Sequence, residues 1–442
     1  MSRRRARVAS SLAVAACLSL SLAAAAPAAP GEVVLVSPPN SAGGIENGID
    51  IVPATSGNGS YVAFLHEAPF GDPTEANPGA ALFLRVMASS ATIPVNVPTG
   101  DSNGNSFEAG SPSLDRTGDR LTFVSEDPDL SREDKDFSTS AAGTHPVRDV
   151  FLFQRVTRKV VLISRGTGIK GTIANANSNL PSISEDGRYV AFGTEANNLT
   201  PKRAYGRTVF GGVYVRDLQK KSTTLVSLAD GRRGAPIDGY DPSISRGGTL
   251  VAFAGRVGPK GNRHAGILVR DVKRGRTRVV SRGGERDCVE PSLAADGRFV
   301  AYTCEAKSRD EGIDQVYVTD LARGRTALVS RGTGKKGRAG GGDSSHPSIS
   351  ADGRLVAFES YANDLGPKDE GRVTDIFVKD TKSGRVHLAS RADGNGAAGN
   401  APSANPSISA DGRFVSFESR SSNLTPQDSE LGSSVFRYQI LP

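Results

Sequence analysis

A short hairpin unit that recurs along the whole chain limits its fold more than any other feature. The clearest copy is Pro347–Phe358, in which four residues of extended character lead into Asp352-Gly353 and an apolar run follows. Asp-Gly between two such runs is a strong hairpin signal, because a two-residue primed turn needs positive φ angles, which glycine tolerates. We therefore expect such a turn at each copy. The other copies are Pro53–Phe64, Pro112–Phe123, Pro181–Phe192, Pro242–Phe253, Pro291–Tyr302 and Pro406–Phe417.

Each full copy of the unit belongs to a group of four expected strands. The hairpin supplies two strands, and a third such as Val316–Asp320 and a fourth such as Thr224–Ser227 or Ala327–Ser330 follow it. The second strand, as in Leu355–Phe358, is apolar on both faces, so its sheet must be covered on both sides. Small sheets that pack face to face against copies of themselves are typical of the blades of a β-propeller.

The two ends of the chain predict how the ring closes. The seventh copy has only three strands, the last at Val435–Gln439, whereas Glu32–Ser37 has the pattern of a fourth strand with no others before it. We therefore expect an all-β, seven-bladed β-propeller of four-stranded antiparallel blades, closed by the N-terminal strand. A six-bladed ring is the alternative, because the copy at Pro53–Phe64 is degenerate.

The repeat unit Pro-Ser-Ile-Ser-x-Asp-Gly-Arg-x-Val-Ala-Phe resembles the WD40-like PD40 repeat of TolB-type propellers, over essentially all of residues 32–442. This resemblance implies a propeller and an exported, usually non-catalytic, protein-binding role. The chain departs from TolB itself in two ways: it has no tryptophan before the turn, and no α/β domain is expected ahead of the propeller. The resemblance is therefore to the broad TolB-like class.

Residues 1–28 have the pattern of an export signal. An arginine-rich start is followed by the apolar run Val8–Ala26 and by Ala26-Pro27-Ala28, a small-residue cleavage site. Residues 29–442 would then form a single propeller domain. An uncleaved anchor and a lipoprotein attached through Cys17 are the alternatives, and the choice between Sec and Tat export stays open. We expect a periplasmic, cell-envelope or extracellular protein with no membrane span after cleavage.

The charge of the chain argues against nucleic acid as a partner. The formal net charge is +7, and Arg3, Arg4, Arg5 and Arg7 supply four of these charges within the expected signal. An excess of +3 over the remaining residues is too small to form a basic binding surface. We expect a monomer whose partner is a protein or a cell-envelope polymer.

Two cysteines outside the expected signal suggest a disulfide. Cys288 and Cys304 flank the hairpin whose turn is Asp296-Gly297, at nearly equal distances from it. Residues that face each other across paired strands have Cα separations compatible with a disulfide. Export would make oxidation plausible, and two buried thiols are the alternative.

Strand order predicts which face of the propeller carries function. The first-to-second and third-to-fourth connections are tight and emerge on one face; the long connections emerge on the other, which is here called the long-loop face. Binding residues usually lie on loops of a rigid scaffold. The residue before each first-strand proline is expected at the mouth of the central channel on that face. Four consecutive repeats place Asp241, Glu290, His346 and Asn405 there, and these are the candidate ligand-binding residues.

These features favour a non-catalytic scaffold that binds its partner through the long-loop face. The alternative is a metal-dependent propeller hydrolase or lactonase, in which Asp241 and Glu290 would hold the metal and His346 would move protons. We expect no catalytic residues and no cofactor, with Ca²⁺ or another divalent cation as the alternative. The acidic loop 126–136 has calcium-loop composition but lacks the Asp-x-Asp-x-Asp-Gly spacing.

Overall fold

The computed structural model describes residues 31–37, 49–67, 80–96, 109–127, 130, 137–140, 143–200, 211–258, 264–281, 287–306, 312–334, 336–366, 373–393, 396–427 and 432–440. The expected export signal at 1–28 lies outside these residues, as does most of the acidic loop 126–136. Within these ranges the regular structure is β-strand apart from one short 3-10 helix, η1 (Arg246–Gly248). No helix in the described ranges is long and apolar enough to cross a membrane.

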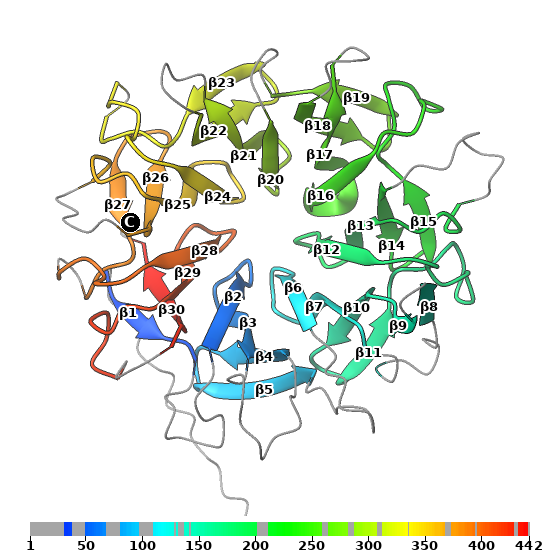
Figure 1. Ribbon diagram of the computed structural model, residues 1–442, viewed down its shortest axis with the longest axis horizontal. Coiled ribbons are helices and arrows are strands. Elements are labelled where there is room, and N and C mark those ends of the chain that lie inside the picture. Colours follow the sequence, from blue (N-terminus) through cyan, green and yellow to red (C-terminus); the bar gives the residue numbers. More distant parts are fainter. Residues whose placement is uncertain are drawn as a thin grey trace, which may run out of the picture.

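The described residues form seven four-stranded antiparallel sheets around a central axis, as Figure 1 shows. The predicted seven-bladed propeller is therefore confirmed, and the six-bladed alternative is wrong. The inner strands, nearest the axis, are β2 (Ile49–Thr55), β6 (Ala109–Leu114), β12 (Ser178–Ile183), β16 (Gly239–Ile244), β20 (Cys288–Leu293), β24 (Ser344–Ile349) and β28 (Ser403–Ile408). The second strands are β3 (Tyr61–Glu67), β7 (Arg120–Ser125), β13 (Tyr189–Thr194), β17 (Leu250–Val257), β21 (Phe299–Ala306), β25 (Leu355–Ser360) and β29 (Phe414–Ser419).

The third and outer strands complete each blade in the order of the repeat. The third strands are β4 (Ala80–Val86), β10 (Asp149–Gln154), β14 (Gly212–Asp217), β18 (His264–Asp271), β22 (Ile313–Asp320), β26 (Asp375–Asp380) and β30 (Ser434–Gln439). The outer strands are β5 (Ala91–Asn96), β11 (Lys159–Leu162), β15 (Ser222–Leu225), β19 (Arg276–Val279), β23 (Arg325–Leu328), β27 (Val386–Leu388) and β1 (Val33–Leu35). A further hairpin of β8 (Phe137–Ser140) and β9 (Gly143–Pro146) lies in the connection between β7 and β10.

The N-terminal strand closes the ring, as predicted. β1 pairs antiparallel with β30, so that Val33 lies opposite Tyr438, and the two strands lie side by side in Figure 1. Beyond the strand, the Val36 N–H donates to the Val435 carbonyl oxygen at 2.7 Å. Because the first and last strands share one sheet, this pairing opposes opening of the ring between the last and first blades.

The hairpin turns differ from the predicted two-residue turn. In the sixth blade the Ser350 N–H donates to the Leu355 carbonyl oxygen, so four residues separate these paired positions. Among these described turn residues only Gly353 has a positive φ, of 72°. The Asp352 carboxylate instead accepts hydrogen bonds from Ser350 Oγ at 2.8 Å and from the Arg354 N–H at 3.0 Å. This side-chain capping stabilises the longer turn, which is why the prediction was wrong.

The outer strands end earlier than predicted. β15 ends at Leu225 and β23 at Leu328, although the Val-Ser pair after each was expected within the strand. The serine has another role: Ser227 Oγ accepts a hydrogen bond from the Val213 N–H, and Ser330 Oγ accepts one from Val316 N–H, both at 3.0 Å. These serines therefore cap the third strand instead of extending the outer one.

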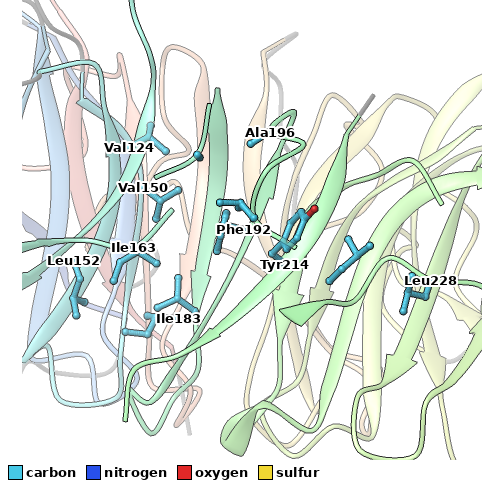
Figure 2. Packing of buried hydrophobic residues seen from close by; sticks show 13 residues of the cluster. Val124, Val150, Leu152, Ile163, Ile183, Phe192, Ala196, Tyr214 and Leu228 are labelled. Carbon is cyan, nitrogen blue, oxygen red and sulfur yellow. The ribbon is translucent and has the colours of Figure 1, made fainter. Parts of the chain in front are cut away.

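The core lies largely between neighbouring blades. Figure 2 shows one such cluster, in which Val124 and Val150 of the second blade pack with Phe192 and Tyr214 of the third. The rings of Phe192 and Tyr214 are stacked with centroids 6.0 Å apart. Each second strand is thus covered on both faces, as its sequence predicted, and a blade depends on its neighbours for burial.

Hydrogen bonds between neighbouring turns link the blades at the end opposite the long-loop face. The Ala351 N–H donates to the Ala410 carbonyl oxygen at 2.9 Å. Between the last and first blades, the Asp411 N–H donates to the Gly57 carbonyl oxygen at 3.1 Å. These contacts hold the hairpin turns together around the axis. The inner strands begin at the other end of the channel, on the long-loop face, where the candidate residues lie.

The predicted disulfide is present. Cys288 in β20 and Cys304 in β21 lie opposite one another in the ladder and are bonded, with Cα atoms 4.2 Å apart. Both residues are buried in the core. The bond therefore joins the inner and second strands of the fifth blade at the end that faces the long loops.

Candidate functional site

Every inner strand is interrupted by a bulge at the residue that precedes its proline. The pairing with the second strand shifts register at this position in each blade. The bulge residues have φ between 48° and 57°, a region that non-glycine residues rarely adopt. They are Val52, Ser111, Leu180, Asp241, Glu290, His346 and Asn405. Because such strain costs about 1–3 kcal/mol and persists only where the surroundings enforce it, its repetition marks the channel mouth as a candidate site.

Glutamates in the second strand of the preceding blade hold two of these bulges. The Asn405 N–H donates to Glu359 Oε2 at 3.0 Å, and the Val52 N–H donates to Glu418 Oε2 at 2.7 Å. Hydrogen bonds to an ionised acceptor are stronger than neutral ones. Sequence reasoning missed both glutamates, although each follows the last aromatic residue of its second strand, where the earlier copies carry no carboxylate.

His346 lies between two carboxylates. Its Nδ1 is 3.0 Å from Glu359 Oε1, and its Nε2 is 3.3 Å from Glu290 Oε1. Glu290 Oε2 also accepts hydrogen bonds from the His346 N–H and from Thr303 Oγ1, both at 2.8 Å. The hydrogen bond to Glu359 and the nearby charge of Glu290 raise the pKa of His346 to about 9. Burial opposes ionisation of Glu359, but the hydrogen bond from His346 and further donors lower its pKa.

We expect His346 to make stability depend on pH. Its raised pKa means that its contribution is fully present below the unfolded pKa of about 6.5 and is lost as pH rises through about 9. The effect is modest, because 47% of the side chain is exposed. Replacing it (His346→Gln) should abolish this part of the decline in unfolding free energy between pH 6.5 and 9. An NMR titration of the wild-type imidazole that gives an ordinary pKa would contradict the assignment.

Asp241 lies beside Glu290 on the other side of the cluster. Burial and then the charge of Glu290 raise the pKa of Asp241 to about 6, although its carboxylate accepts a hydrogen bond from the Glu290 N–H. Three of the four predicted residues therefore interact directly, and Asn405 is joined to them through Glu359. Whether they bind a ligand stays a prediction.

A cavity of about 740 Å³ opens beside this cluster, across the second to fourth blades. Its lining includes three bulge residues, Ser111, Leu180 and Asp241, and lies at the ends of strands that meet the long-loop face. Leu180 and Tyr240 expose 42% and 43% of their surface there. Nothing in the repeat pattern predicts this cavity, because it lies between blades rather than within one.

Within the described residues, no three histidine, cysteine, aspartate or glutamate side chains are grouped as ligands for a metal ion. The cluster is instead arranged as a chain, in which Glu290 and Glu359 both bond to His346. Whether Asp241 and Glu290 hold a metal ion, as the alternative function requires, stays a prediction.

No protein-family model matches the chain, and no curated protein matches its sequence. Solved propeller structures resemble it. An oligogalacturonate lyase in complex with manganese is 13% identical, with a TM-score of 0.52 over 92% of this chain and 93% of that chain. The β-propeller domain of the Trilobed protease from Pyrococcus furiosus, described as having an open velcro topology, is 12% identical, with a TM-score of 0.52 over 89% and 93%.

TolB from Acinetobacter baumannii is also among these structures. It is 16% identical, with a TM-score of 0.42 over 78% of this chain and 66% of that chain. At such identities, the likeness to the lyase and to the protease domain establishes the fold and no activity. The propeller implied by the TolB-like repeat is thereby confirmed, while the function has to be argued from the residues at the channel mouth.

Proposed function

We propose that the chain is an exported, non-catalytic propeller that binds a protein partner at the channel mouth of its long-loop face. The observation that carries this proposal is the cavity of about 740 Å³, whose lining exposes Leu180 and Tyr240. Exposed apolar and aromatic side chains in a concave site are typical of binding surfaces. The disulfide between Cys288 and Cys304 supports an oxidising compartment outside the cytosol.

The contacts of the polar cluster also favour binding over catalysis. Glu290, Glu359 and Glu418 accept hydrogen bonds from backbone amides of the strained bulges, which is a structural task. Both ring nitrogens of His346 face carboxylates, so proton transfer would first have to break one of these contacts. A rigid, hydrogen-bonded rim suits a preorganised binding surface.

The enzyme alternative rests on a different observation, the proximity of Asp241 to Glu290. Burial and then the charge of Glu290 raise the pKa of Asp241, and two adjacent carboxylates are a common arrangement before a cation binds. The manganese complex of the oligogalacturonate lyase makes this arrangement worth a test on the same fold. Elemental analysis of the purified protein that finds metal lost in the Asp241→Ala variant would favour the hydrolase or lactonase.

Site-specific photo-crosslinking tests the binding proposal. A benzophenone side chain at Tyr240, on the cavity wall, is expected to form an adduct with one envelope protein in native cells. The matched control is Val156, which is also apolar and 75% exposed but lies in the turn between β10 and β11 on the opposite face. Adducts that form equally from both positions, or from neither, would contradict the proposed surface.

A further inference from the structure

The seven blades differ in what their bulge amides bond to. In each blade one second-strand residue lies opposite the residue just before the bulge, and this position is here called the cap position. The cap positions are Leu65, Val124, Gly193, Ala254, Thr303, Glu359 and Glu418. Where the cap position is a glutamate, its carboxylate accepts the N–H of the bulge residue in the next blade.

Bulge side chains replace the missing caps in two further blades. The cap positions Ala254 and Thr303 carry no carboxylate. Instead, the Asp241 carboxylate accepts a hydrogen bond from the Glu290 N–H, and the Glu290 carboxylate accepts one from the His346 N–H. A carboxylate oxygen therefore lies before the bulge amide in four blades, supplied in two different ways. The repeated φ near 50° gives these amides a common backbone conformation, which favours an anionic acceptor at the same place.

Three bulge amides have no such partner among the described residues. They belong to Ser111, Leu180 and Asp241, and the cap positions before them are Leu65, Val124 and Gly193, which offer no hydrogen-bond acceptor in their side chains. The same three bulge residues line the cavity of about 740 Å³. The three bulge residues whose amides lack a carboxylate partner are therefore the ones that line the cavity.

Resting on the function proposed above, we propose that this cavity binds an acidic peptide segment of the partner, whose carboxylates bond to the amides of Leu180 and Asp241. The peptide oxygens take the place that Glu359 and Glu418 fill in the other blades. Charge-assisted bonds to strained, preformed amides favour a carboxylate over a neutral group.

The remaining lining suits a peptide. Leu180 and Tyr240 offer apolar surface for side chains next to the acid. Arg256 is at the rim and forms no ion pair with a described residue, whereas Arg148 is bonded to Glu126 at 2.8 Å. The lining also includes acidic residues, Glu195 and Asp238 besides Asp241. Recognition of the peptide carboxylates therefore depends on nearby hydrogen-bond donors rather than on a net positive charge of the cavity.

Gly193 allows a direct test, because a side chain there should fill the site from within. A Cβ at this position would lie 3.7 Å from the Asn179 carbonyl oxygen and 4.0 Å from Tyr240 Cα, which is ordinary contact. The Gly193→Glu variant should place a carboxylate before the Asp241 amide, as Glu359 does for Asn405. We expect it to weaken binding of the peptide at least tenfold, whereas Gly193→Ala should change affinity less than twofold.

The probe is a fluorescent, end-blocked tetrapeptide of alternating leucine and aspartate, and its asparagine counterpart is the neutral control. Fluorescence anisotropy should detect binding of the acidic peptide only, and ¹⁵N NMR should show shifts of the Leu180 and Asp241 amide signals. Equal affinity of wild type and Gly193→Glu, unshifted amides, or equal binding of the neutral peptide would overturn the proposal. Gly193-sensitive binding of digalacturonate without binding of the peptide would overturn the choice of a peptide.

The outcomes also separate this inference from the function on which it rests. If the Tyr240 crosslink forms and the acidic peptide fails to bind, the partner surface stands and the carboxylate site is wrong. If the peptide binds in a Gly193-sensitive way and no crosslink forms, the site stands and the proposed protein partner is wrong. A normal thermal unfolding midpoint for Gly193→Glu serves as the check that the variant is folded.

Discussion

A chain without residues 31–37 is expected to lose most of its resistance to unfolding. Val33 and Val36 are 4% and 0% exposed, and burial of two such side chains contributes roughly 3–6 kcal/mol. Backbone hydrogen bonds to β30, including the one from the Gly31 N–H to the Gln439 carbonyl oxygen, add about 1 kcal/mol each. Together these approach the ~5–15 kcal/mol that separates folded from unfolded domains, so we expect a partly open or unfolded ring.

Guanidinium denaturation followed by circular dichroism measures this effect. A permuted chain that carries residues 31–37 after Ile440 should recover stability, because β1 begins beside the end of β30 and a short turn can join them. Recovery would assign the loss to the missing strand rather than to a shortened chain. An unchanged denaturation midpoint in the truncated protein would contradict ring closure by β1.

Removal of the disulfide should lower the unfolding free energy by about 3 kcal/mol, the loop-closure contribution for a bridge of this span. The Cys288→Ser, Cys304→Ser double variant is the best replacement, because another blade already has two serines at this pair of positions. The same pair of positions is Ser344 and Ser360 in the sixth blade, with hydroxyl oxygens 2.8 Å apart. We therefore expect the double variant to keep the native fold and to lose only the covalent contribution.

Denaturation with and without a reducing agent measures the contribution of the disulfide. Wild type should fall to the stability of the double variant when reduced, and the double variant should not respond to the reductant. A single Cys288→Ser substitution serves as a control, because it leaves one thiol and should resemble the reduced protein. A wild-type midpoint that does not change on reduction would show that the bond contributes nothing to stability.

The elements of each blade were predictable because their causes are local. The Asp-Gly turn, the doubly apolar second strand and the spacing of Cys288 and Cys304 each depend on residues close together in the chain. Errors arose where a side chain competed with the backbone pattern. Asp352 capped a longer turn than expected, and Ser227 capped the third strand where an outer strand was predicted.

The candidate site was only partly predictable. Placing Asp241, Glu290 and His346 at one rim required nothing more than the repeat register and circular closure. The capping role of Glu359 could not be read in the same way, because its partner Asn405 belongs to the next blade. The cavity lies where Val124 and Gly193 precede amides of the next blade, which the register within one blade does not reveal.

The sequence by itself therefore determined the number of blades, the strand order, the closing strand and the disulfide, since each follows from a repeated local pattern or from pairing within one sheet. Only the tertiary structure decided the strained bulges, the carboxylates that hold four of them and the cavity beside the bulges that lack such a carboxylate. The physical reason is that these features are contacts between neighbouring blades, and their energies depend on how the sheets pack around the axis.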